Sequence, residues 1–152
     1  MSILIALALT LVTQDSDKDL VLAEVALHGG HWAVMSFEYD GMPAASDVVK
    51  SITRQVQGER VTWKRDGKSF SGSTMKLDIK AKPKRITIVP EGGQLQDKAV
   101  KGIYKLEGDT LTLCMAEPGA DAPKEFSAAK GTRYTLVTLK RTTAPAKRTR
   151  KP

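Results

Sequence analysis

The sequence has only one cysteine, Cys114, so no disulfide can form within the chain. It has two histidines, and aromatic residues make up 5% of its composition. It lacks the His-Glu-x-x-His metal motif, the Gly-x-Ser-x-Gly nucleophile motif and the glycine-rich phosphate loop that ends in Lys. These absences argue against a disulfide-stapled scaffold and against the common metal-, serine- and nucleotide-dependent enzymes. We therefore expect a protein that is not an enzyme and that needs no cofactor.

The few residues that could still carry chemistry are better explained by structure. His28 and His31 are three positions apart, which in a strand or loop points them to opposite faces, and no third ligand joins them, so we expect no metal site. Cys114 lies inside an apolar strand pattern and is expected to be a small, partly buried residue. Glu107 and Asp109 are typical of a hairpin turn. An exported hydrolase is the least favoured alternative, because no nucleophile–base pair stands out.

Basic residues exceed acidic ones, but the excess is concentrated at one end. The net charge is +7, and four positive charges lie in the last six residues, so the rest of the chain carries +3 (seven minus four). The body lacks the interleaved basic and aromatic residues that track a nucleic-acid strand, so we expect no specific nucleic-acid partner. We interpret residues 142–152 as a basic, disordered tail. With 152 residues and 41% apolar residues, we expect a single domain and a monomer.

An uninterrupted apolar run occupies residues 3–12 and is too short to span a bilayer as a helix. Polar residues follow it abruptly from Gln14 onward. This pattern favours a secretory signal peptide, so residues 1–18 are expected to be a leader, without a transmembrane anchor. The protein would then be exported to the periplasm, the cell envelope or the medium. The alternative is a buried N-terminal strand or helix of the domain.

Strand signals recur at short intervals through the body of the chain. Asp40-Gly41 and Asp66-Gly67 mark turns between them, and a short helix is plausible after Pro43. No segment shows the strand–helix alternation of a parallel sheet. Residues 19–141 therefore predict an all-β domain, an antiparallel up-and-down barrel of about eight strands, whereas a β-sandwich would need longer crossovers. The predicted strands are residues 31–39, 61–65, 73–78, 85–89, 102–107, 110–116 and 133–141.

Two motifs at the ends of this domain resemble the lipocalin superfamily. Gly30-His31-Trp32 opens the first strand, and Leu139-Lys140-Arg141 closes the last. The stretch from Gly29 to Pro43, together with Leu106-Glu107-Gly108-Asp109-Thr110-Leu111, is similar to an uncharacterised planctomycete-type family of small lipocalin-like domains. The resemblance covers residues 19–141 and implies a lipocalin-like barrel and a secretion signal. The family has no assigned activity, so the resemblance implies a fold and not a ligand.

The resemblance also assigns structural roles to Gly30, Trp32 and Arg141. In lipocalins the tryptophan of the Gly-x-Trp motif packs beneath a basic residue of the last strand. We therefore expect the Trp32 indole to be buried across one end of the barrel, with Arg141 or Lys140 over its face and the first and last strands paired. Gly30 should let the chain approach closely beneath the first strand.

Strand alternation indicates which side chains face the interior. On the face of Trp32, it places Val34, Ser36 and Glu38 inward. A mostly apolar interior with a few polar groups suits a small apolar or amphipathic ligand, with Ser36, Glu38 and Tyr104 as polar anchors. The alternative is a filled barrel with Glu38 at its mouth, acting as a structural or interaction domain of the cell envelope. The expected ligand-binding residues are Ser36, Glu38, Trp63, Met75, Tyr104 and Met115. The other expected inward residues are Val61, Leu77, Ile86, Ile88, Leu106, Leu111 and Leu113.

Overall fold

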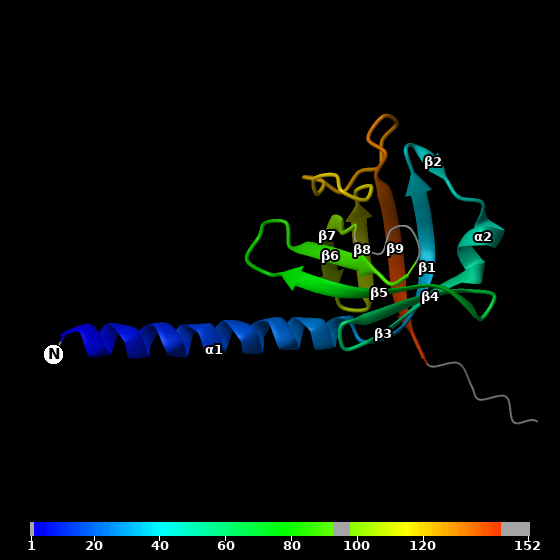
Figure 1. Ribbon diagram of the computed structural model, residues 1–152. Helices are drawn as coiled ribbons and strands as arrows, with labels where there is room; N and C mark the ends of the chain where they lie inside the picture. Colours follow the sequence, from blue (N-terminus) through cyan, green and yellow to red (C-terminus); the bar gives the residue numbers. More distant parts are fainter. Residues whose placement is uncertain (1, 93–97, 144–152) are drawn as a thin grey trace, which may run out of the picture.

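A single antiparallel sheet of nine strands closes on itself, because β1 pairs with both β3 and β9 (Figure 1). This computed structural model describes residues 2–92 and 98–143, with side chains from Asp15 onward. The elements are α1 (Ser2–His28), β1 (Gly30–Tyr39), β2 (Met42–Pro43), α2 (Ser46–Ser51), β3 (Ile52–Gln57), β4 (Arg60–Arg65), β5 (Lys68–Asp78), β6 (Arg85–Pro90), β7 (Val100–Glu107), β8 (Thr110–Met115) and β9 (Thr135–Thr142).

Every strand from β3 to β8 pairs with the next strand along the chain. The two-residue β2 pairs with β1, so the other eight strands make the closed barrel. Closure removes the unpaired strand edges that an open meander would expose. The structure therefore confirms the predicted up-and-down barrel of about eight strands, with the short helix α2 after the first strand. The sequence pattern did not single out β3, the short strand between α2 and β4.

The interior is lined by the residues that strand alternation predicts for β4 to β8. Val61, Met75, Ile86, Tyr104, Leu111 and Leu113 are buried in one cluster, and Trp63, Leu77, Ile88, Leu106 and Met115 pack against it partly buried. Because the side chains of a strand alternate between its faces, these positions share the inner surface. The prediction of the inward face is confirmed for all of these strands.

The first strand departs from this regular alternation. The pairing of β1 with β9 shifts register between Val34 and Ser36, which marks a β-bulge at Met35. The extra residue reverses the faces beyond it, so Phe37 rather than Ser36 packs against the core. Ser36 is exposed, and the prediction that Ser36 and Glu38 follow Trp32 and Val34 inward is wrong for this reason.

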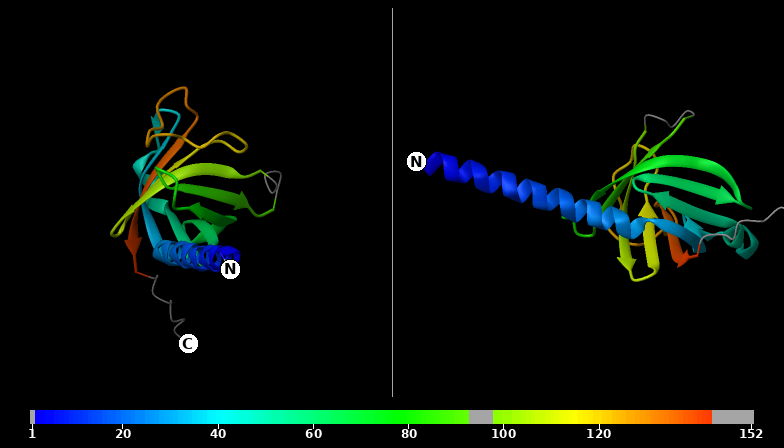
Figure 2. Two further views of the ribbon diagram at one scale, coloured as in Figure 1. Left: turned by 90° about the vertical axis from the view of Figure 1, so that its left-hand side faces the viewer. Right: turned by 90° about the horizontal axis from the view of Figure 1, so that it is seen from below.

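The helix α1 ends on the barrel and otherwise projects away from it (Figures 1 and 2). Val25 is 6% exposed and belongs to the core, and Val21 packs against the same cluster. The helix stops at Gly29-Gly30, where Gly29 N donates to the Ala26 carbonyl and Gly30 adopts a φ of +111°. The region N-terminal to the barrel is thus helical across residue 18, where the leader is predicted to end.

In the described residues, no helix has both the length and the apolar character that crossing a membrane requires. Residues 144–152 of the predicted tail lie outside the described part of the chain.

Candidate ligand-binding site

A cavity of about 220 Å³ lies among the inward side chains of β3 to β8. Most of its lining is apolar, and the polar lining residues are Arg54, Ser71 and Ser73. Ser71 is exposed and therefore lies at the rim, whereas Arg54 and Ser73 are buried. A mostly apolar cavity with a few fixed polar groups is the common form of a small-ligand site. The apolar lining residues are Val61, Trp63, Ile86, Ile88, Pro90, Val100, Leu113 and Met115.

Arg54 is the most unusual residue of this cavity. It alternates with Ile52 and Val56 on the inner face of β3, and its side chain is 1% exposed. Its neighbours in the sheet are Trp32 on β1 and Trp63 on β4. Antiparallel neighbours share a face, so all three side chains point inward. The Arg54 Cζ lies 5.9 Å from the Trp63 ring centroid, which is within cation–π range.

The Arg54 guanidinium has few hydrogen-bond partners. Its Nη2 donates to Met75 Sδ at 3.8 Å, and thioether sulfur is a weak acceptor. Its Nε and Nη1 have no partner among the described residues. Burial lowers the pKa of Arg54 to about 10, so the group is still a cation at neutral pH. A buried cation without an anionic partner is costly for the folded state and calls for a functional explanation.

Ser73 gives the cavity a second polar group without a partner. It lies on β5 opposite Val61 of β4 and Pro90 of β6. Its side chain is 2% exposed, and its Oγ has no hydrogen-bond partner in the described part of the chain. A hydroxyl can donate or accept, so Ser73 can bond either kind of polar group.

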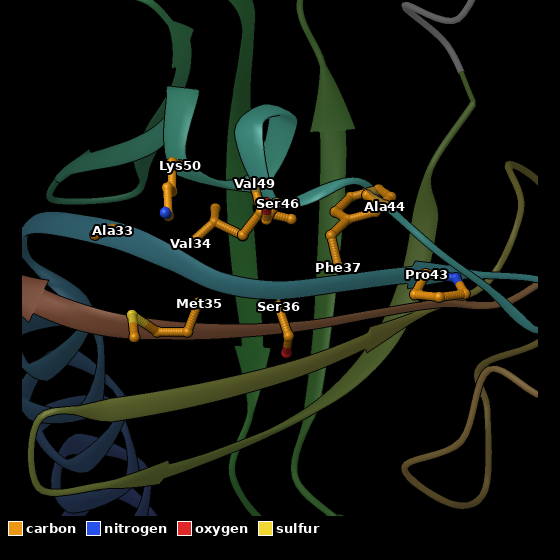
Figure 3. A pocket seen from close by; sticks show the side chains of 10 residues that line it. All are labelled: Ala33, Val34, Met35, Ser36, Phe37, Pro43, Ala44, Ser46, Val49 and Lys50. Atoms are coloured by element: carbon orange, nitrogen blue, oxygen red, sulfur yellow. The ribbon is translucent and has the colours of Figure 1, made fainter.

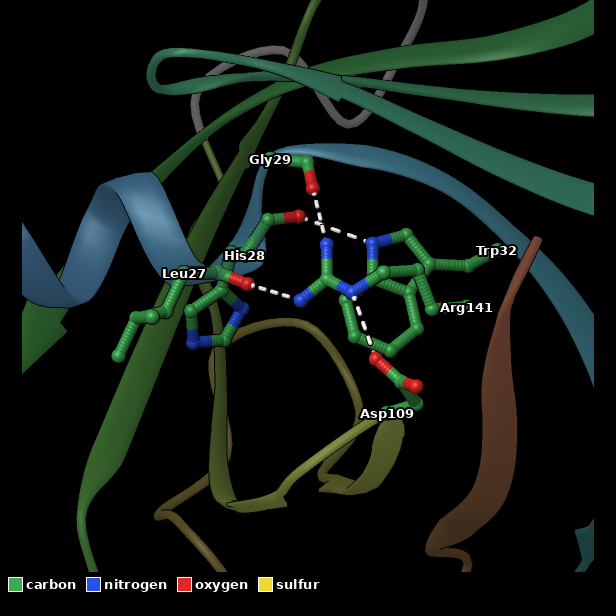
Figure 4. Close-up of polar contacts among 6 residues, drawn as sticks. All are labelled: Leu27, His28, Gly29, Trp32, Asp109 and Arg141. Atoms are coloured by element: carbon green, nitrogen blue, oxygen red, sulfur yellow. Dashed lines mark hydrogen bonds and ion pairs between the residues drawn. The ribbon is translucent and has the colours of Figure 1, made fainter. Parts of the chain in front are cut away.

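One end of the barrel is sealed by the Trp32–Arg141 contact that the sequence predicts (Figure 4). Trp32 is fully buried, and the Arg141 Cζ lies 4.3 Å from its ring centroid. The indole Nε1 donates to the His28 carbonyl at 2.9 Å. These observations confirm the predicted burial of Trp32, the position of Arg141 and the pairing of the first and last strands.

Arg141 also ties the end of α1 to the barrel. Its Nη1 and Nη2 donate to the carbonyls of Gly29 and Leu27 at 2.6 and 2.7 Å, and its Nε donates to Asp109 at 3.2 Å (Figure 4). Gly30 is required here for its φ of +111°, which other residues rarely adopt. A Cβ on Gly30 would lie 3.5 Å from Arg141 Nη1, an ordinary contact, so the expected close approach is not the reason for this glycine.

Beside this closure, α1 inserts polar side chains against the barrel. Glu24 accepts hydrogen bonds from Tyr104 Oη and Lys84 Nζ, both at 2.9 Å. Burial raises the pKa of Glu24, but these two bonds outweigh it and lower the pKa overall. Burial and the Glu24 bond raise the pKa of Tyr104. Tyr104 therefore anchors the helix, and its hydroxyl is already engaged.

His28 is fully buried, and its ring meets the Tyr104 ring edge-on with the centroids 4.8 Å apart. Neither ring nitrogen has a partner among the described side chains and backbone groups. Burial, and next the charge of Arg54, lower the pKa of His28 to about 4, so the ring is neutral at pH 7. His28 thus lies as a neutral ring at the joint between α1 and the barrel.

A second pocket, of about 450 Å³, lies between β1 and α2 (Figure 3). Val34, Phe37 and Val49 point toward one another, whereas Met35 and Ser36 extend from the other side of β1 (Figure 3). Met35 is 58% exposed, and no buried unpaired polar group lines the described part of this pocket. It is a surface cleft beside the bulge, and it offers a ligand less fixed chemistry than the barrel cavity.

The predicted ligand-binding residues therefore do not form one site. Trp63 and Met115 line the barrel cavity, and Met75 touches Arg54. Ser36 lines the surface cleft, and Tyr104 bonds Glu24. Glu38 is half-buried and lines neither the cavity nor the cleft.

Sequence reasoning missed the two buried polar groups of the cavity. The signal for Arg54 is the alternation Ile52-Thr53-Arg54-Gln55-Val56, which places the arginine on the apolar face. Ser73 precedes Met75 at the same spacing in β5. Cys114 is buried as expected, its Sγ donates to the Ser127 carbonyl, and burial raises its pKa.

No protein-family model matches this chain, and neither a curated protein nor a solved structure matches it significantly. The resemblance to the lipocalin-like family thus stays a prediction from the sequence motifs.

Proposed function

We propose that this chain is a non-enzymatic binding domain that holds a small apolar or amphipathic molecule inside its barrel. The observation that carries the proposal is the 220 Å³ cavity, whose mostly apolar walls include two buried polar residues, Arg54 and Ser73. Among the described residues, Ser73 Oγ and the Nε and Nη1 of Arg54 have no hydrogen-bond partner. A filled structural barrel gains nothing from such groups, since each loses hydration without gaining a bond. A ligand that forms hydrogen bonds with Arg54 and Ser73 replaces the hydration that these groups lose on burial.

Two small probes test this function: 1-hexanol and hexanoate. NMR of the full chain should show either probe shifting the Met115 methyl and the Trp63 indole N–H, both of which line the cavity. The matched control is Val100→Phe, because Val100 lines the same cavity and a larger side chain there fills it. Loss of the shifts in this variant would support binding inside the barrel. Absence of shifts with both probes would refute the function.

The alternative function, a structural or interaction domain, is favoured by the surface of α1. Leu20, Leu22 and Leu27 are each more than half exposed, although leucine is usually buried. Light scattering over a range of protein concentrations tests this alternative and the expected monomer together. Association that is lost in Leu22→Lys would favour an interaction domain.

Export of the protein is part of the proposal. It is supported by the apolar run at residues 3–12 and by the position of the contacts between α1 and the barrel core. Val21, Glu24, Val25 and His28 make those contacts, and all lie after residue 18. Removal of the leader would therefore leave them intact. The intact mass of protein from the exporting cell tests this, and a chain that retains Met1 would contradict it.

A further inference from the structure

The polar part of the cavity consists of hydrogen-bond donors around a fixed positive charge. Arg54 is 1% exposed, and no carboxylate of the described residues pairs with it. Its Nε and Nη1 are donors without acceptors, and a guanidinium cannot accept. The missing partner must therefore be an acceptor, and an anion would also compensate the charge.

The contrast with Arg141 shows that this fold can provide hydrogen-bond acceptors for an inward arginine. Arg141 also lies over a tryptophan, but three oxygen atoms surround its guanidinium. Arg54, two strands away across β1, has one sulfur contact instead. The described residues thus provide oxygen partners for Arg141 and none for the Nε and Nη1 of Arg54, which lines the cavity.

The size and charge of the cavity narrow the class of anion. A volume of 220 Å³ accommodates roughly seven groups of the size of a water molecule, at about 30 Å³ each. One buried cation balances one negative charge, which favours a carboxylate over a doubly charged phosphate. The apolar walls favour an uncharged hydrocarbon body on that carboxylate.

We propose that the barrel binds a small monocarboxylate with a short apolar tail, whose carboxylate accepts hydrogen bonds from Arg54 and Ser73. The tail lies against Val61, Trp63 and Met115, which line the same cavity. This inference rests on the proposed binding function and assigns its ligand class. Ser73 Oγ is buried and has no partner in the part of the chain that the structure describes, so it offers a second donor, from β5.

The test compares three probes of equal length on the full chain by isothermal titration: hexanoate, 1-hexanol and hexylamine. Hexanoate should bind at least tenfold more tightly than 1-hexanol, because hydrogen bonds to charged groups are the stronger kind. Hexylamine should bind most weakly, since it places a second cation beside Arg54. Equal affinity for hexanoate and 1-hexanol would overturn the carboxylate inference while leaving the binding function in place. Binding of none of the three probes would overturn both.

Variants then identify which positive charge is responsible for hexanoate binding. Arg54→Met should lose hexanoate affinity at least tenfold and keep its affinity for 1-hexanol, and Ser73→Ala should lose hexanoate affinity several-fold. Arg60→Met is the matched control, because Arg60 is a surface arginine of the adjacent strand β4 and its removal changes the net charge equally. An equal loss in Arg60→Met and Arg54→Met would overturn the proposal in favour of nonspecific attraction. Unchanged hexanoate binding in Arg54→Met would also overturn it.

Discussion

Replacing Arg54 with methionine should stabilise the empty protein, although the residue lies in the middle of the core. Burial lowers the pKa of Arg54 from 12.5 to about 10. At about 1.4 kcal/mol per pKa unit, the buried charge costs about 3 kcal/mol. The contact with the Trp63 ring returns up to about 2 kcal/mol of this. Methionine is shorter, but it is unbranched and apolar and carries no charge, so the net gain should be about 1–2 kcal/mol.

Urea unfolding at pH 7 measures this gain, and the melting temperature should rise by about 2–4 °C for each kcal/mol. The control is Arg141→Met, which removes a guanidinium with three oxygen partners and should destabilise the protein. If Arg54→Met lowers the free energy of unfolding by 1 kcal/mol or more, the reasoning that Arg54 is uncompensated is refuted. The same result would mean that an anionic partner of Arg54 is already present in the empty protein.

Four further substitutions probe the joint between α1 and the barrel, the barrel wall and the Trp32–Arg141 closure. Because His28 has a pKa of about 4 when folded and 6.5 when unfolded, the unfolded chain binds the proton first as pH falls. Its contribution, about 3 kcal/mol, is present above pH 6.5 and lost towards pH 4, and urea titrations should show a shallower loss in His28→Phe. Gly102→Ala should cost about 1–3 kcal/mol in thermal unfolding, since its Cβ would lie 2.6 Å from the Cys114 carbonyl oxygen. Trp32→Ala should cost about 3–5 kcal/mol in urea, and Arg141→Ala about 2 kcal/mol; equal costs would contradict this ranking.

The strands of the barrel could be predicted because their alternation is simple. In β4 to β8, apolar residues such as Val61, Met75 and Leu113 recur at every second position between polar ones. Turn pairs such as Asp66-Gly67 separate the strands, so both the boundaries and the inward faces follow from local chemistry. The pairing of the first and last strands was predicted from the two end motifs that contain Trp32 and Arg141. The sheet brings these two residues together over a long sequence separation.

The candidate site was predicted less accurately than the strands, because its geometry depends on tertiary features. The bulge at Met35 inserts one residue into β1, and no local signal in Ala33-Val34-Met35-Ser36-Phe37 requires it. That single insertion turns Ser36 outward and Phe37 inward. For Arg54 the sequence does contain a signal, because the residue alternates with apolar neighbours. It was not predicted as a cavity residue because charged residues are normally assigned to the solvent face.

The two inward arginines differ in the partners that the described residues offer them. Arg141 and the last turns of α1 cover the end at which Trp32 lies, and every donor group of this guanidinium is bonded. Ser71, at the rim of the cavity, lies in the first half of β5, whereas α1 bonds Lys80 beyond the other end of that strand. The exposed rim of the cavity at Ser71 thus lies away from the end of β5 that α1 contacts. Because the sealed end holds its cation with the protein's own oxygens, the open donors of Arg54 point to an acceptor that arrives from outside the chain.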